Sequence, residues 1–177
     1  FSPEQIFKVV VDVDKYHKFV PWCTKSVVYH QQVSLANRPS IVPEARGLVV
    51  PSRRVPADLE VGYSAFQERY TSMVTSEEPW RVEVKALSHN SNLFRELRTT
   101  WEFIPLSAVP APQLRALRYD PKLYHSMGQD GSGACLVRFH IKFQFTSELY
   151  SRVSQMFFDG VCKEMVNAFK NRCRQVY

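Results

Sequence analysis

Carboxylates are the first residues in this chain whose type and spacing would suit acid–base chemistry. Glu77 and Glu78 are adjacent, but they precede a proline in a predicted turn, where both side chains would be solvated. Glu68 differs, because strand parity places it on the same face as Tyr70 unless a bulge intervenes. A carboxylate on an apolar inner face needs a partner or a raised pKa. Glu68 is therefore the strongest candidate for catalysis, although a structural role is favoured.

Histidine and cysteine spacing predicts neither a metal site nor a disulfide framework. The histidines are His17, His30, His89, His125 and His140, and the cysteines are Cys23, Cys135, Cys162 and Cys173. Neither set contains C-x-x-C or metal-ligand spacing, so we interpret the cysteines as reduced thiols in a reducing compartment. The sequence also lacks a phosphate-binding loop, a G-x-G-x-x-G motif and a nucleophile elbow. We therefore expect no metal, no cofactor and no enzymatic activity, and we interpret the protein as one that binds a ligand.

The composition favours a single domain over residues 1–177 and an anionic partner. The chain is 45% apolar and 13% aromatic, which is enough for a substantial core. Its formal net charge is +6 and its pI is near 9.2, which favours nucleic acid, acidic lipid or an acidic protein. No basic–aromatic interleaving typical of base stacking is present, so we do not expect nucleic acid. No apolar run approaches the roughly 18 residues that a membrane span needs.

Residues 147–177 predict one long helix that is apolar over about half its girth. Two neighbouring apolar rows follow helical spacing: Val153, Phe157, Val161, Met165 and Ala168 form the first, and Phe158, Cys162, Val166, Phe169 and Cys173 form the second. A polar row contains Arg152, Lys163, Lys170 and Arg174. A flat surface cannot cover two adjacent apolar rows. We therefore expect a curved sheet around this helix, with an apolar cavity between the two.

Alternation of apolar and polar residues predicts that sheet. Residues 59–63, 66–74, 80–85, 97–103 and 135–145 all place apolar side chains on one face. One-sided strands are typical of an antiparallel sheet with one covered face and one solvated face. Two short helices are predicted before the strands, beginning at a Ser-Pro-Glu-Gln capping sequence and ending near residue 19. The order of elements indicates an α+β architecture.

Two proline-rich stretches interrupt the pattern, at about residues 33–56 and 105–133. The first is the more basic and contains Arg38, Arg46, Arg53 and Arg54. We predict a long loop there, with a solvated insertion favoured over a specific binding element.

Several blocks of this sequence carry a family resemblance. The most specific block, residues 11–23, reads VDVDKYHKFVPWC, and others are residues 59–63, 68–72, 101–103, 137–139 and 143–145. Together with the final helix they cover most of the chain outside the two proline-rich stretches. These blocks resemble the coenzyme Q-binding protein COQ10 family, which is part of the START-like polyketide cyclase/dehydrase superfamily.

The resemblance implies a START-like helix-grip fold with a lipid-sized cavity. It also implies binding of ubiquinone (coenzyme Q) and a role as a carrier or chaperone that supports ubiquinone biosynthesis and respiratory electron transport. The implied location is the matrix side of the mitochondrial inner membrane, as a peripheral protein on an anionic surface, with respiratory-chain complexes as candidate partners. In the family pattern a strand precedes the first helix, and we expect this strand to be missing from the sequence. The stretches at 33–56 and 105–133 exceed what the family core needs.

The predicted faces of the strands and the helix, together with the family resemblance, predict the residues that line the cavity. The sheet would contribute Tyr63, Phe66, Tyr70, Trp101 and Phe103, the helix Val153, Phe157, Val161 and Met165, and the mouth Phe19 and Trp22. Each aromatic residue has ordinary core packing as its alternative. An enzyme is the first rival function, because other superfamily members cyclise polyketides in an equivalent cavity, where Glu68 or Tyr70 would act. An interaction module is the second, because a bacterial relative is described as a ribosome-associated toxin.

Overall fold

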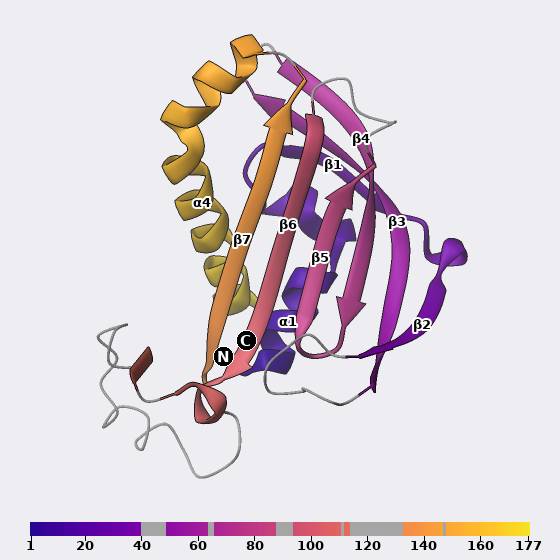
Figure 1. The fold of residues 1–177 in the computed structure, drawn as a ribbon, viewed down its shortest axis with the longest axis vertical. Helices are drawn as coiled ribbons and strands as arrows, with labels where there is room; N and C mark the ends of the chain where they lie inside the picture. Colours follow the sequence, from indigo (N-terminus) through magenta and orange to yellow (C-terminus); the bar gives the residue numbers. More distant parts are fainter. Residues whose placement is uncertain (40–48, 64–65, 88–93, 111, 114–132, 147) are drawn as a thin grey trace.

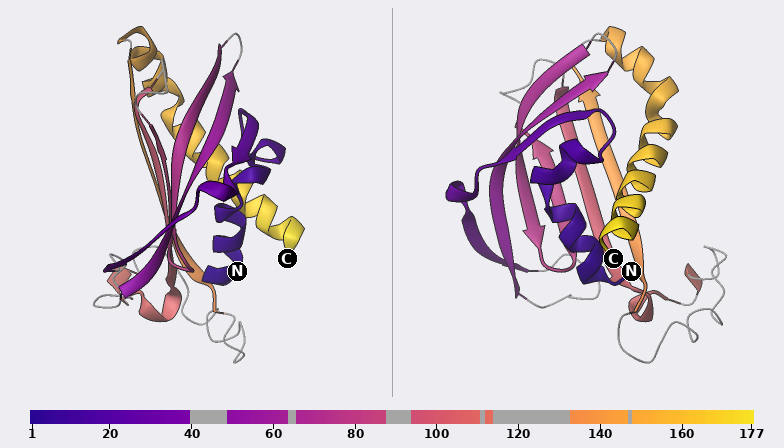
Figure 2. Two further views of the ribbon diagram at one scale, coloured as in Figure 1. Left: turned by 90° about the vertical axis from the view of Figure 1, so that its right-hand side faces the viewer. Right: turned by 180° about the vertical axis from the view of Figure 1, so that it is seen from behind.

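A curved antiparallel sheet forms one layer of the molecule, and the helices Pro3–Val11, Val13–Lys18 and Glu148–Val176 lie on one face of it (Figures 1 and 2). The computed structural model describes residues 1–39, 49–63, 66–87, 94–110, 112–113, 133–146 and 148–177, and their side chains except at 38–39, 63, 66 and 148–159. We call the face that carries the helices the inner face. The predicted α+β architecture, with a curved antiparallel sheet and a long C-terminal helix, is confirmed.

The described part of the sheet contains seven strands. They are β1 (Cys23–Val28), β2 (Ser34–Pro39), β3 (Val49–Tyr63), β4 (Phe66–Glu77), β5 (Arg81–Ala86), β6 (Phe94–Pro105) and β7 (Cys135–Phe145). Their order is β1-β3-β4-β5-β6-β7, and β2 also pairs with β3. The length of β3 makes this possible, because β1 pairs with its residues 57–61 and β2 with its residues 49–54.

The prediction of a long loop over residues 33–56 is wrong for the described part of that stretch. Residues 34–39 and 49–54 are paired antiparallel strands, with Ser34 opposite Arg54. Pro51 precedes the first β3 residue that pairs with β4, and Pro56 lies between the stretches that pair with β2 and β1. Each proline therefore lies where one side of β3 has no ladder partner, so its missing N–H costs little. Most of residues 105–133 falls outside the described residues, and its interpretation as an insertion stays a prediction.

The helices are α1 (Pro3–Val11), the 3-10 helices η1 (Val13–Lys18), η2 (His30–Gln32) and η5 (Leu106–Ala108), and α4 (Glu148–Val176). The predicted capping sequence forms a complete capping box. The Ser2 hydroxyl accepts from the Gln5 N–H at 3.3 Å, and the Ser2 N–H donates to the Gln5 side chain at 3.0 Å. No helix in the described ranges is long and apolar enough to cross a membrane.

The core lies between the inner face and α1, η1 and the C-terminal half of α4. Phe7 of α1 packs edge-to-face on Phe103 of β6, with ring centroids 6.2 Å apart. Phe169 is the main anchor of α4: its ring lies 4.6 Å from Trp101, 5.3 Å from Tyr16 and 5.1 Å from Phe19. Phe169 is 2% exposed, so these contacts fix the C-terminal half of the helix against the sheet.

The outer face of the sheet carries a buried carboxylate. Asp58 of β3 is 8% exposed and accepts hydrogen bonds from Tyr29 at 2.8 Å, Arg69 at 2.5 Å and Thr71 at 2.8 Å. Burial alone would raise the pKa of Asp58, but the donors from Thr71, Arg69 and Tyr29 outweigh it and lower that pKa below its ordinary value. The ionised form of Asp58 therefore stabilises the folded protein.

We expect the free energy of unfolding of Asp58→Asn to change less with pH in the acid range than that of wild type. The unfolded chain binds a proton at Asp58 more readily than the folded chain does, so this carboxylate contributes stability above its unfolded pKa of about 3.9. That contribution is lost as the pH falls through the lowered folded pKa. Urea unfolding at a series of pH values should give a variant that is about 1–3 kcal/mol less stable near neutrality and less dependent on acid. Parallel curves for the two proteins would contradict the assignment.

Candidate functional site

The inner face of β6 and β7 is apolar apart from Thr99. It is closely packed on β6 at the end near α1, whereas Val137 of β7 is only half buried even there. Trp101 and Phe103 are 3% and 0% exposed. Farther along the same two strands, away from α1, the apolar side chains are only half buried. These residues, which we call the inner wall, are Phe94, Leu97, Phe139, Ile141, Phe143 and Phe145.

The inner wall is a continuous surface made of cross-strand pairs. Phe94 lies opposite Phe145 and Leu97 opposite Phe143 in the ladder between β6 and β7. The Phe94 ring lies 5.2 Å from that of Phe145 and 5.8 Å from that of Tyr70 on β4. Phe143 and Phe145 are 5.4 Å apart, edge-to-face. Flat aromatic faces and aliphatic carbons together suit an apolar ligand that contains a planar ring.

Helix α4 runs beside β7 and crosses towards α1, so its C-terminal half ends near the closed part of the core (Figures 1 and 2). Val161 and Met165 are half buried, and Met165 packs against the core. Val166 is 42% exposed and points away from the core. The contact of Phe169 with Trp101 packs this end of the helix directly on the sheet.

The structure brings three of the predicted sheet and helix residues to the edge of the inner wall. Tyr70 is 6% exposed and touches Phe94. Trp101 lies 4.3 Å from Phe139, and Met165 packs on the same cluster of core residues. Val161 is half buried one turn before Met165.

Other predicted residues lie elsewhere. Phe103 lies deeper, beneath α1, and Phe19 contacts the opposite side of Phe169 at the end of η1. Trp22 occupies the turn before β1 with a positive φ of 62° and is half buried. The side chains of Tyr63, Phe66, Val153 and Phe157 lie outside the described residues, so their part in the site stays a prediction. The backbone places Tyr63 opposite Phe66 at the turn between β3 and β4.

Sequence reasoning selected none of the six inner-wall residues as site residues. The signal was present, because the alternation over residues 135–145 places Ile141, Phe143 and Phe145 on the inner face. It did not show how far α1 and α4 extend over that face. That extent decides which apolar residues become core and which are left half buried.

Two buried titratable groups of the core, Tyr70 and Cys23, are held in their neutral forms. Burial raises the pKa of Tyr70 above its ordinary value and raises the pKa of the Cys23 thiol to about 11. Glu68 shares the inner face of β4 with Tyr70, as strand parity predicted, and is half buried. Among the described residues, no group of three histidine, cysteine or acidic side chains is placed to hold a metal ion. The half-buried apolar side chains of the inner wall are suited to burying an apolar ligand.

Comparison with known proteins agrees with this geometry. A family model described as polyketide cyclase / dehydrase and lipid transport matches residues 1–170. The chain belongs to this family. A mitochondrial coenzyme Q-binding protein COQ10 from Drosophila melanogaster is 32% identical over 99% of this chain, which confirms the predicted resemblance. The chain spans about half of that relative's length, 55%. The ribosome association toxin RatA from Vibrio cholerae is 25% identical, with 100% of this chain and 91% of the toxin covered.

Solved structures show that this member of the polyketide cyclase family has the START-like fold. A START superfamily protein from Mycobacterium smegmatis superposes with a TM-score of 0.62 at 13% identity, covering 99% of this chain and 92% of that one. The Zhui aromatase/cyclase from Streptomyces sp. R1128 superposes with a TM-score of 0.58 at 11% identity, covering 98% and 87%. Identities this low carry the fold and no further.

Proposed function

We propose that the protein binds ubiquinone, or a related polyprenyl quinone, between the inner wall and α4 and carries it without chemical change. The half-buried state of the inner wall is the observation that supports this most. The wall is apolar, lies on the face that carries α1 and α4, and keeps its side chains only partly buried. The COQ10 relative is named as a coenzyme Q-binding protein, which supports quinone as the ligand class.

The physical basis of the proposal is the burial of apolar surface on both partners. Removing apolar surface from water gains about 25 cal/mol per Å². An isoprenoid tail and the six wall residues would both gain from mutual contact. The quinone ring would stack on phenylalanine faces such as Phe94 and Phe145, which already adopt tilted ring geometry with each other.

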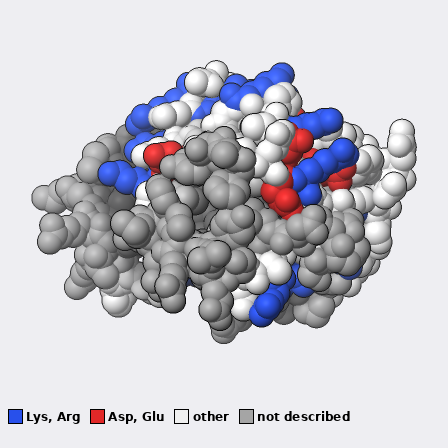
Figure 3. All heavy atoms as spheres, turned by 90° about the horizontal axis from the view of Figure 1, so that it is seen from above, with Lys and Arg blue, Asp and Glu red and all other residues white. Residues whose placement is uncertain are grey.

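The proposed setting is an anionic membrane surface on the matrix side of the mitochondrial inner membrane. There the protein would support ubiquinone biosynthesis and electron transport, with respiratory-chain complexes as partners. The net charge of +6 suits such a surface. Figure 3 shows Lys and Arg side chains along the upper edge of the picture, where few Asp and Glu side chains are seen.

A cyclase-type enzyme is the alternative, because Glu68 and Tyr70 share the inner face and the Zhui aromatase/cyclase has this fold. Incubation of the purified protein with ubiquinone, followed by organic-solvent extraction and mass spectrometry, separates the two. We expect ubiquinone to be recovered with its mass unchanged. A converted product that appears with wild type but not with Glu68→Gln would contradict the carrier proposal. Co-sedimentation with ribosomes, and none with anionic vesicles, would instead favour the interaction module.

A further inference from the structure

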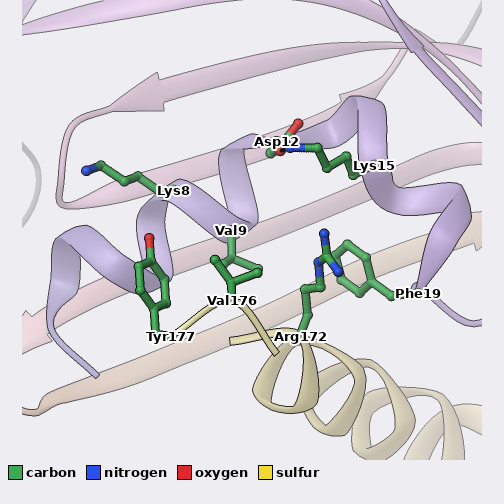
Figure 4. Close-up of a pocket in the computed structure, with 8 residues that line it drawn as sticks. All are labelled: Lys8, Val9, Asp12, Lys15, Phe19, Arg172, Val176 and Tyr177. Carbon is green, nitrogen blue, oxygen red and sulfur yellow. Dashed lines mark hydrogen bonds and ion pairs between the residues drawn. The ribbon is translucent and has the colours of Figure 1, made fainter. Parts of the chain in front are cut away.

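A cavity outside the inner wall lies between α1, η1 and the last turns of α4 (Figure 4). Its volume is about 210 Å³. We call it the basic groove and define it by six of its lining residues: Lys8, Val9, Lys15, Phe19, Arg172 and Val176. Phe19 also contacts Phe169, so an aromatic wall separates the groove from the core.

Cations dominate the rim of the groove. Lys8 and Lys15 come from α1 and η1, and Arg172 comes from α4. Asp12 also lines the groove, where its carboxylate pairs with Lys15 at 2.5 Å. The Arg172 guanidinium lies over the Phe19 ring, 5.6 Å from its centroid, and this contact orients it. Three cations against one carboxylate leave a site that attracts anions.

The floor of the groove is apolar. Val9 and Val176 lie next to each other in the middle of the groove in Figure 4, and Phe19 lies at one end. Val9 is 7% exposed, whereas Val176 is 48% exposed. The groove is smaller than the roughly 300–1,000 Å³ of typical small-molecule pockets, so it does not suit a polyprenyl quinone. A compact anionic group with apolar carbon attached would match both the rim and the floor.

We propose that the basic groove binds the phosphate headgroup of an anionic phospholipid and docks the protein on a membrane. Arg172 would contact the phosphate oxygens, Lys8 at the other end of the groove would add longer-range attraction, and the glycerol and first acyl carbons would lie over Val9 and Val176. Arginine suits this role because its planar fork matches phosphate oxygens. Free inorganic phosphate would use the cations but leave the apolar floor uncovered, so a lipid fits better. The purpose of this docking rests on the proposed function, because a quinone carrier must meet the membrane that holds its ligand.

Vesicle binding by charge variants tests this proposal. The groove variant is Lys8→Glu with Arg172→Glu, and the matched control is Lys163→Glu with Lys170→Glu, two exposed positions of α4 outside the groove. Both doubles change the formal charge equally. Flotation with phosphatidylcholine–phosphatidylglycerol vesicles should show a loss of roughly 30-fold or more for the groove variant, and a much smaller loss for the control. Pure phosphatidylcholine vesicles should bind neither protein strongly.

Several outcomes would overturn the proposal. Equal losses of vesicle binding in both double variants would show a general charge effect. Inorganic phosphate that displaces wild type from vesicles, at a concentration equal to the lipid phosphate that saturates the protein, would favour the free ion as the ligand. Loss of ribosome binding in the groove variant, with unchanged vesicle binding, would favour RNA as the partner.

A milder variant keeps the test valid if the charge reversal harms folding. Because Arg172 packs on Phe19, Lys8→Gln with Arg172→Gln repeats the test if the charge reversal alters the urea midpoint. Quinone recovery is expected to survive in the groove variant. Failure of wild type to yield any quinone, with its vesicle binding intact, would refute the proposed function and leave the groove proposal standing.

Discussion

Phe169→Ala should lower the free energy of unfolding by about 3–5 kcal/mol, the largest stability loss we expect from a single change in α4. The Phe169 residue is 2% exposed, and its ring touches those of Trp101 on β6, Tyr16 in η1 and Phe19 directly after η1. Removing it leaves a cavity that the rigid sheet and the short helices cannot close. It also removes the contact that fixes the C-terminal half of α4.

Val166→Ala is the matched control for this loss. Val166 belongs to the same predicted apolar row but is 42% exposed. We expect its free energy of unfolding to change by no more than about 0.5 kcal/mol. Urea unfolding followed by far-ultraviolet circular dichroism measures both variants. Similar losses in the two would mean that Phe169 does not anchor α4 as described.

Phe143→Asp should weaken ubiquinone binding roughly 100-fold or more, because a bound quinone would bury an unpaired carboxylate in the inner wall. Phe143 lies on the inner face opposite Leu97 and is half buried, so the charge stays partly hydrated when no ligand is bound. The folded protein should therefore tolerate the substitution better than the complex does. Quenching of intrinsic tryptophan fluorescence by added ubiquinone gives the affinity.

The neighbouring residue supplies a control with the same introduced charge. Gln144 follows Phe143 on β7 but is exposed on the outer face. Gln144→Asp should bind ubiquinone within about twofold of wild type. Val161→Asp and Val166→Asp form a second pair on α4, half buried and exposed respectively. If all four variants bind alike, the quinone does not lie between the inner wall and α4.

Local periodicity was enough to predict most, but not all, elements of this fold. The Ser2–Gln5 capping pattern, the alternation over residues 135–145 and the length of the final helix depend on neighbours in sequence, and all three are confirmed. The hairpin within residues 33–56 was missed because its prolines read as loop signals. They are tolerated only where β3 lacks a partner on one side, which depends on the pairing of distant strands.

The orientation of the final helix needed tertiary information. Val166 and Phe169 belong to one predicted row, yet one is exposed and the other buried. Helix α4 crosses the edge of the sheet obliquely, so the part of its circumference that meets protein changes along its length (Figure 2). The basic groove was equally hidden, because Lys8 and Arg172 come from opposite ends of the chain.

Photo-crosslinking with a ubiquinone analogue that carries a photoreactive group tests the central claim most directly. Peptide mass spectrometry of the irradiated complex locates the adducts. We predict adducts on inner-wall residues of β6 and β7 and on α4 near Val161 and Met165, all suppressed by excess ubiquinone. Adducts confined to the outer face, at residues such as Arg138 and Gln144, or to the basic groove would contradict quinone binding between the inner wall and α4.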